Sequence, residues 1–238
     1  MSLLADLEVS RMYPAREIRV RRGEEELVLG PTLMTDADAI ALAAKESNAE
    51  LRPFMPWAHF PQNEISQLQR LRTTEADYFA GRELVMGLFR EIPGARRELV
   101  VMVGLHARVP LNPTALEVGY WAPTKFTKQG FTTFAVKLVV TYAFDKLGAD
   151  RVQVMCDEAN VASRRVIEKC GFALEGVLRN VTPSITPDLV AGGYAATGRH
   201  PMYALFPDTF AALPWTEETR AQMRYVNLAG YEVPPVKT

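Results

Sequence analysis

Residues 160–176 read NVASRRVIEKCGFALEG, and they follow the apolar, β-branched run RVQVMC at residues 151–156. An asparagine such as Asn160 favours a helix start, because its side-chain oxygen accepts a hydrogen bond from a backbone amide of the first turn. A glycine such as Gly171 is typical of a helix end, because it adopts the left-handed conformation without a steric penalty. The segment therefore predicts a strand, a short helix and a second strand, with polar side chains gathered where the helix begins.

The sequence upstream of this segment has strand-like runs followed by a helical repeat. From Phe131 to Ala143 the apolar residues recur at helical spacing, and Gly148 ends the pattern. The other predicted elements are strands at 27–29, 83–90, 99–109, 116–121 and 202–206 and helices at 36–45 and 64–80, with a Pro- and Gly-rich loop at 181–198. Strands and helices alternate in the middle of the chain, so we expect an α/β fold.

Composition sets limits on the class of protein. The chain has 238 residues, 48% hydrophobic and 23% charged, with a formal net charge of -1. These values are typical of a globular protein with a buried core, and they argue against a surface that binds nucleic acid or an anionic membrane. With neither a signal peptide nor a long apolar run, a cytoplasmic location is expected. We divide the chain into an N-terminal extension (1–26), a central domain (27–215) and a C-terminal tail (216–238).

The two cysteines and three histidines do not have the spacing of metal ligands. Cys156 and Cys170 each lie in an apolar run and are expected to be buried free thiols. We therefore expect no metal.

The segment at 160–176 resembles the coenzyme-binding half of the Gcn5-related N-acetyltransferases (the GNAT family), and in particular its RimJ/RimL-like branch, which acetylates the N-termini of ribosomal proteins. Asn160, Ser163 and the pairs GF at 171–172 and EG at 175–176 match that branch in register. The resemblance implies a GNAT fold, a mixed central sheet in which an antiparallel N-terminal meander joins a splayed central parallel pair, flanked by helices. It also implies that residues 27–215 form an acyl-CoA N-acyltransferase domain, with acetyl-CoA as co-substrate.

The resemblance further implies a coenzyme site between the strand at 116–121 and the next helix. In the family the pantetheine arm enters a gap beside this strand, and backbone amides at the helix N-terminus bind the pyrophosphate. The coenzyme contacts implied in this way are Tyr120, Trp121, Lys128, Gln129, Gly130, Phe131, Thr132, Asn160 and Ser163. The loop departs from the family pattern, because Thr127, Lys128 and Thr132 stand where an Arg or Gln, a Gly and a small residue are usual. Only Gly130 is retained, so a loop that no longer binds coenzyme A is the alternative.

Acetyl transfer from a thioester to an amine needs a base for the amine and a proton for the leaving thiolate. Many family members supply that proton from a tyrosine, but Ile167 occupies its position here. Ser163 is therefore predicted as the catalytic group at the sulfur and Glu117 as the base. The loop LRPFMPW at 51–57 is similar to one that lines the acceptor side of the cleft in this branch, so Phe54 and Trp57 are predicted to bind substrate. Each residue also has a purely structural alternative. Ser163 would be a hydroxyl on the helix surface, Glu117 a solvated strand residue, and Phe54 and Trp57 part of the core.

Together these residues predict an enzyme, a GNAT-type N-acetyltransferase that moves an acetyl group from acetyl-CoA to a primary amine on a protein N-terminus or a small molecule. Two alternatives stay open: a non-catalytic acyl-CoA-binding or interaction module, and an acyltransferase with a larger donor such as succinyl-CoA. The expected partners are acetyl-CoA and an amine acceptor, without nucleic acid or membrane, and a homodimer stays open. Variable loops build the acceptor pocket, so the sequence leaves the acceptor unidentified.

Overall fold

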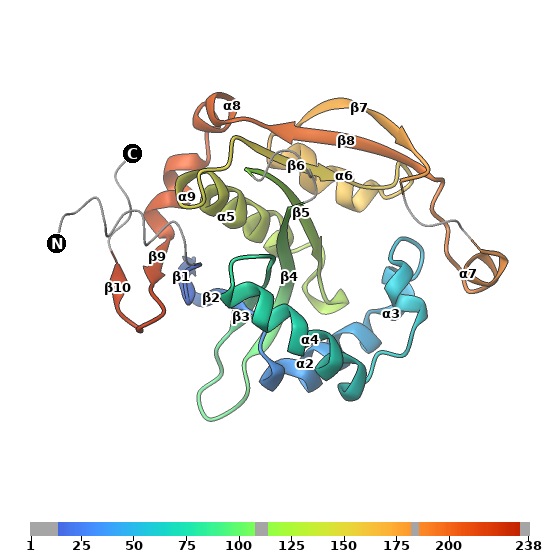
Figure 1. The fold of residues 1–238 in the computed structure, drawn as a ribbon, viewed down its shortest axis with the longest axis horizontal. Helices are drawn as coiled ribbons and strands as arrows, with labels where there is room; N and C mark the ends of the chain where they lie inside the picture. Colours follow the sequence, from blue (N-terminus) through green and yellow to red (C-terminus); the bar gives the residue numbers. More distant parts are fainter. Residues whose placement is uncertain (1–13, 108–113, 182–185, 234–238) are drawn as a thin grey trace.

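A computed structural model describes residues 14–107, 114–181 and 186–233 of the chain. Figure 1 shows a twisted sheet with helices on both of its faces. The ten strands found in the described residues lie in the order β10-β9-β1-β2-β3-β4-β5-β6-β8-β7. Neighbouring strands are antiparallel except for the parallel pair of β5 and β6. The predicted mixed sheet, with an antiparallel meander and one central parallel pair, is thus confirmed.

The strands are β1 (Glu17–Arg22), β2 (Glu25–Pro31), β3 (Leu84–Arg90), β4 (Glu98–Ala107), β5 (Ala115–Trp121), β6 (Arg151–Met155), β7 (Ala173–Arg179), β8 (Arg199–Leu205), β9 (Arg224–Val226) and β10 (Glu232–Val233). The α-helices are α2 (Ala37–Glu46), α3 (Asn48–Leu51), α4 (Glu64–Phe79), α5 (Phe131–Asp145), α6 (Val161–Lys169), α7 (Pro187–Ala191), α8 (Pro207–Ala211) and α9 (Thr216–Gln222). Short 3-10 turns, η1 (Met34–Asp36), η2 (Pro56–His59) and η3 (Thr124–Phe126), precede α2, α4 and α5.

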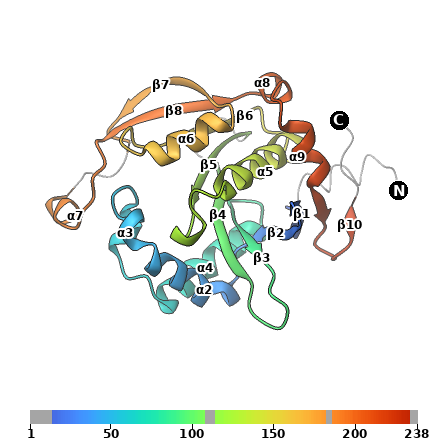
Figure 2. The ribbon, with the colours of Figure 1, turned by 180° about the vertical axis from the view of Figure 1, so that it is seen from behind.

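The alternation of side chains along β4 divides the molecule into two layers. Val103 and Leu105 of β4 belong to the same buried cluster as the core residues of α5. Met102, on the opposite face of β4, packs in a second cluster with residues of α2 and α4. Figure 2 shows the same arrangement from behind, with α5 and α6 on one side of the sheet and α2 and α4 on the other. Successive residues of β4 and β5 therefore face different helical layers.

The sequence prediction that the first strand begins at residue 27 is wrong. β1 pairs with β2 along its length and also with β9, so the sheet extends into the predicted extension. Ile18 and Val20 are buried (2% and 1% exposed), while charged side chains alternate with them. That alternation is typical of a half-exposed strand, but the charged residues obscured it in the sequence. The division of the chain at 26/27 and 215/216 stays a prediction.

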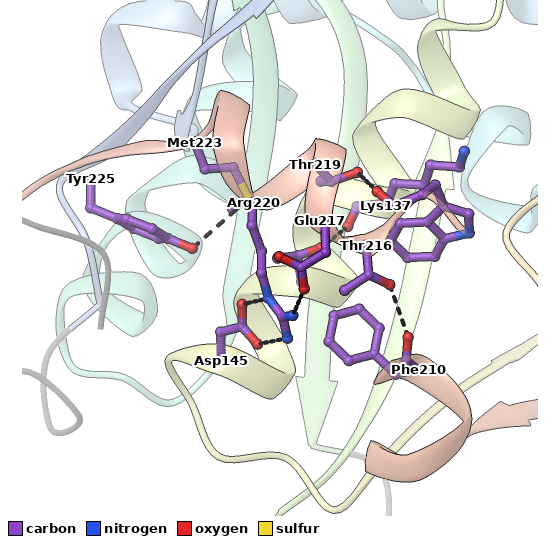
Figure 3. Close-up of polar contacts among 11 residues, drawn as sticks. Lys137, Asp145, Phe210, Thr216, Glu217, Thr219, Arg220, Met223 and Tyr225 are labelled. Carbon is purple, nitrogen blue, oxygen red and sulfur yellow. Dashed lines mark hydrogen bonds and ion pairs between the residues drawn. The ribbon is translucent and has the colours of Figure 1, made fainter. Parts of the chain in front are cut away.

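The C-terminal segment packs on α5 (Figure 3). Arg220 of α9 binds Asp145 at the end of α5 through two hydrogen bonds, at 2.7 and 2.8 Å. Trp215 is buried and has the Lys137 ammonium 5.1 Å from its ring centroid. β9 then pairs with β1, so the two ends of the described chain stabilise each other.

Candidate active site

The candidate active site is a cleft where β5 and β6 part. Their pairing ends at Glu117 and Gln153, whereas β6 continues beside β8 as far as Met155. Beyond Glu117, the backbone groups of β5 on that side face the gap instead of a neighbouring strand. The cleft has a volume of about 650 Å³. The predicted site residues that line it are Phe54, Trp57, Glu117, Tyr120, Trp121, Asn160 and Ser163.

Tyr120 and Ser163 meet at the start of α6. The Tyr120 hydroxyl lies 2.8 Å from Ser163 Oγ and donates to the Ser163 carbonyl oxygen at 3.2 Å. Burial raises the pKa of the Tyr120 phenol, which therefore keeps its proton at neutral pH. Asn160 Oδ1 accepts a hydrogen bond from the Ser163 amide at 3.0 Å and caps α6. Ile167 is buried in the core, and its hydrocarbon side chain has no proton to donate.

Both cysteines are buried and unpaired, as predicted. Cys156 lines the cleft, where burial raises the pKa of its thiol and a hydrogen bond to Ser163 opposes that shift. Burial raises the pKa of Cys170 to about 12. Both groups are therefore neutral thiols at physiological pH.

The loop before α5 lies outside the residues that line the cleft. Gly130 has a φ of 83° and precedes the first residue of α5. Lys128 has a φ of 60°, the left-handed conformation that favours glycine, at the position where the family pattern has a glycine. The Phe131 side chain is 3% exposed and packs in the core. Only its backbone amide can therefore contribute to a coenzyme site.

Arg22 of β1 reaches this loop from a distant part of the sequence. Its Nη2 donates to the Gln129 carbonyl oxygen at 2.6 Å, and its guanidinium lies 4.3 Å from the Phe131 ring centroid. Lys125, by contrast, is engaged by Glu98, with Nζ 2.6 Å from Oε1. Arg22 was not predicted as a site residue, because no local signal links positions that lie 107 residues apart.

The side of the cleft where the sequence predicted the acceptor is lined by η2 and the loop around it. The ring centroids of Trp57 and Trp121 lie 5.5 Å apart and form an aromatic wall. The segment 186–198, predicted as a loop, contains α7 and packs on this region. Ala195 N donates to the Pro53 carbonyl oxygen at 2.9 Å, and Tyr194 meets His59 edge to face. The described part of the β7–β8 connection thus packs against the loop at 51–57 and η2.

His106 of β4 lines the cleft beside Glu117, its cross-strand partner in β5. Its Nδ1 lies 2.6 Å from Glu83 Oε1, and its Nε2 extends over the paired glycines Gly104 and Gly119. A Cβ on Gly104 would lie 2.8 Å from that Nε2. The glycines therefore make room for an imidazole with one nitrogen held by a carboxylate and the other over the splayed strand.

The register of the sheet also explains why Glu83 and His106 meet. Leu84 of β3 pairs with Leu105 of the antiparallel β4. Glu83, which precedes Leu84, therefore lies next to His106, which follows Leu105. The sequence favours a structural or surface role for His106 and leaves open that it reaches the cleft if its strand face points inward; the structure places it in the cleft lining. His200 also lines the cleft and is 5% exposed, and its Nδ1 has no hydrogen-bond partner within the described ranges.

No group of three or more His, Cys, Asp or Glu side chains suited to a metal ion occurs among the residues whose structure is described. Within those same ranges, no helix is both long and apolar enough to span a membrane.

The sequence matches known acetyltransferases. The family model described as "Acetyltransferase (GNAT) domain" matches residues 27–173. YoaA of Bacillus subtilis, an uncharacterized N-acetyltransferase, is 32% identical over 146 residues, which cover 61% of this chain and 80% of YoaA. The ribosomal-protein-serine acetyltransferase of Escherichia coli is 26% identical over 129 residues, covering 54% of this chain and 69% of that protein.

The fold is also shared with solved structures. RimJ of Mycobacterium smegmatis, in complex with CoA-disulfide, superposes with a TM-score of 0.67 at 20% identity, covering 87% of this chain and 95% of RimJ. RimL in complex with coenzyme A gives a TM-score of 0.66 at 17% identity, covering 80% and 99%. The family model spans more than half of the chain, including the splayed strand pair and α6. The chain therefore belongs to the GNAT family and is an acetyltransferase.

Proposed function

We propose that this acetyltransferase moves the acetyl group of acetyl-CoA directly to a primary amine while both substrates are bound. The observation that carries the proposal is the opening between β5 and β6, because successive residues of β5 face opposite sides of it. Tyr120 extends toward Ser163 and α6, whereas Glu117 lies beside His106 on the other face. Proton donors and proton acceptors thus line a single cleft.

The residues around the loop before α5 fit the phosphates of coenzyme A. The first amides of α5 lack intrahelical partners, and the helix dipole favours an anion at this end. Lys128 is exposed, and Arg22 already contacts the loop; neither has a carboxylate partner within the described ranges. We propose that Lys128, Gln129, Gly130, Phe131 and Thr132 contact the pyrophosphate, the last four through backbone groups.

On the α6 side, Tyr120, Trp121, Asn160 and Ser163 complete the proposed coenzyme site. We propose that Ser163 donates its proton to the leaving thiolate of coenzyme A. The Tyr120 hydroxyl then turns its proton from the Ser163 carbonyl oxygen to Ser163 Oγ, which lies 2.8 Å away, and donates it there. The phenol regains a proton from solvent after the products leave. The two hydroxyl groups thereby take the role of the tyrosine that many family members have at the position of Ile167.

On the acceptor side, the amine must lose a proton before or during attack. Glu117 is the base predicted from the sequence, and its Oε2 accepts a hydrogen bond from Gln153 at 3.0 Å. His106 is the stronger candidate, because Glu83 holds its Nδ1 and thereby leaves the Nε2 lone pair toward the cleft. Replacement of each by glutamine distinguishes them, because general-base catalysis contributes about 10²- to 10⁴-fold in rate.

We propose that the amine belongs to a protein N-terminus or to a small molecule, and that it packs against Phe54 and Trp57. The E. coli relative is named for ribosomal-protein serine, which supports a protein acceptor. We further propose a cytoplasmic location, where acetyl-CoA and such acceptors occur together. A homodimer stays a prediction.

The proposed function is tested by following release of free thiol from acetyl-CoA in the presence of a library of amines, with the acetylated product identified by mass. We expect release with at least one primary amine, and a faster rate with acetyl-CoA than with succinyl-CoA. Acetyl-CoA alone should raise the melting temperature. At a hundredfold excess over Kd, binding should increase the free energy of unfolding by about 2.7 kcal/mol. A missing thermal shift with millimolar acetyl-CoA would falsify the coenzyme site, and a preference for succinyl-CoA would overturn the choice of donor.

A further inference from the structure

Arg70 of α4 places a positive charge on the acceptor side of the cleft. It is half-buried and lines the cleft with Ser66 and Gln67 of the same helix. Its Nε donates to Gln67 Oε1 at 3.0 Å. Within the described ranges no carboxylate forms an ion pair with Arg70, and neither Nη1 nor Nη2 has a hydrogen-bond acceptor. Among the described residues, no group therefore occupies the outer edge of the guanidinium.

A chain of hydrogen bonds orients this guanidinium. Gln62 Nε2 donates to the backbone carbonyl oxygens of Trp57 and Phe60, each at 2.9 Å. Gln67 Nε2 donates to Gln62 Oε1 at 3.0 Å, and its own Oε1 accepts from Arg70. Gln67 is 6% exposed. The chain thus links Arg70 to the loop that carries Trp57, the aromatic wall of the acceptor side.

Other partly buried arginines of the described residues are held by carboxylates, whereas Arg70, like Arg22 and Arg52, is not. Arg97 is held by both carboxylate oxygens of Asp36, and Arg220 is held by Asp145. At Arg70, burial lowers the pKa of the guanidinium, with no opposing effect from a carboxylate. Removing a cation from water without a counter-charge is unfavourable. A ligand that supplied the anion would remove that penalty.

The carboxylates that line the cleft are engaged elsewhere. Glu117 accepts a hydrogen bond from Gln153. Asp157 accepts hydrogen bonds from the Thr197 amide and hydroxyl and from the Gly198 amide. Neither of these two carboxylates therefore pairs with Arg70, which leaves the counter-charge to be supplied by a bound ligand.

We propose that Arg70 binds a carboxylate on the amine acceptor, so that the substrates are amines that carry an acidic group. The proposal rests on the proposed acetyl transfer to an amine and names the class of acceptor. The two free Nη groups suit the two oxygens of a carboxylate, and such a charge-assisted, bidentate contact is strong and directional. Two sources share this chemistry: the carboxylate of a small amino acid and an acidic side chain near a peptide N-terminus.

The experiment compares matched acceptors in the thiol-release assay. The small-molecule arm uses 4-aminobutanoate against 4-aminobutanamide, and the peptide arm uses an Ala-Glu peptide amide against its Ala-Gln counterpart. For at least one arm, we expect the wild-type kcat/KM to be about ten- to a hundredfold higher for the carboxylate. Arg70→Gln should abolish that preference by raising KM for the carboxylate acceptor, with little change for the neutral one. Arg70→Lys should retain part of the preference, because it keeps the charge and loses the fork.

Arg72→Gln is the matched control, because Arg72 lies on the same helix but is exposed and does not line the cleft. It should keep the wild-type preference, and acetyl-CoA affinity should be unchanged in all three variants. Equal kcat/KM for both members of both pairs, or a preference that survives in Arg70→Gln, would overturn the proposal. So would a stronger preference for phosphoethanolamine than for 4-aminobutanoate.

A binding measurement separates failure of this proposal from failure of the proposed function. With coenzyme A present, the preferred carboxylate acceptor should raise the melting temperature of the wild type and Arg72→Gln, but not of Arg70→Gln. Suppose that no amine is acetylated but a carboxylate amine still stabilises the wild type and Arg72→Gln, and not Arg70→Gln. The carboxylate site then stands and the proposed transfer reaction fails. If neutral amines are acetylated without this pattern of stabilisation, the reaction stands and the carboxylate site is wrong.

Discussion

Replacing Tyr120 with phenylalanine tests whether the buried phenol supplies a proton through Ser163. The change removes one hydroxyl, which lies 2.8 Å from Ser163 Oγ, and leaves the ring packing in place. A hydrogen bond that stabilises developing charge contributes about 1.5–3 kcal/mol, which corresponds to about ten- to a hundredfold in kcat. Ser163→Ala should lower kcat by a similar factor. Both variants should bind acetyl-CoA with nearly unchanged Kd, because the lost interaction matters chiefly in the transition state.

The double variant decides between a relay and two separate contributions. If Tyr120 acts through Ser163, then Tyr120→Phe should have little further effect in the Ser163→Ala background, and the coupling energy should be about 1.5 kcal/mol or more. Steady-state kcat at saturating acetyl-CoA gives the cycle, and calorimetry gives Kd. The control is Tyr142→Phe, which removes another buried phenol, one that accepts a hydrogen bond from Ala15 N at 2.8 Å far along the chain. Additive losses, or an unchanged kcat in Tyr120→Phe, would refute the relay.

Three further predictions concern the loop before α5 and the C-terminal helix. Gly130→Ala should destabilise the protein by about 1–2 kcal/mol, because an alanine at a φ of 83° is strained and its Cβ would lie 3.3 Å from Arg22 Nη2; calorimetry should also show acetyl-CoA binding weakened by tenfold or more. Lys128→Gly should stabilise the protein by about 0.5–1 kcal/mol in thermal unfolding, since glycine adopts a positive φ freely, and should weaken acetyl-CoA binding at low salt if the ammonium contacts phosphate. Arg220→Met should lower the urea midpoint by an amount equivalent to about 1–3 kcal/mol, because Asp145 loses both of its guanidinium bonds (Figure 3); an unchanged midpoint would show that the pair contributes nothing.

Local patterns accounted for the elements that surround the coenzyme side. The helical spacing from Phe131 and the Asn160 cap correspond to α5 and α6, because both signals depend on residues within a few turns of each other. The same reasoning missed β1, whose buried Ile18 and Val20 alternate with charged residues. It placed α7 in a loop, because a helix of five residues has too few turns to show periodicity.

Some site residues that the sequence did not predict are brought together by the pairing of two strands. Glu83 and His106 lie 23 positions apart and meet only because β3 and β4 pair in one register. A shift of that register by one residue would turn His106 away from the cleft. Arg70 carried no signal in the sequence, because an arginine on an amphipathic helix is ordinary. Only the folded structure shows whether a carboxylate of the protein pairs with the Arg70 guanidinium.

The alternation of side chains along β5 explains why the proposed acid and base lie apart. Gly119 and Tyr120 are adjacent, so they face opposite sides of the sheet. The His106 imidazole approaches Gly119, and the Tyr120 phenol extends toward Ser163. An amine entering past Trp57 would lose its proton on the first side, and the thiolate would gain one on the second. We infer that this separation keeps the base from taking the proton of the acid, since the strand itself lies between them. A Gly119 side chain would test the first half of this arrangement, because its Cβ would lie 3.3 Å from His106 Nε2. Gly119→Ala should therefore displace the imidazole and reduce kcat, by no more than His106→Gln does, while leaving acetyl-CoA binding intact. A variant with full activity would show that the imidazole does not act over this strand.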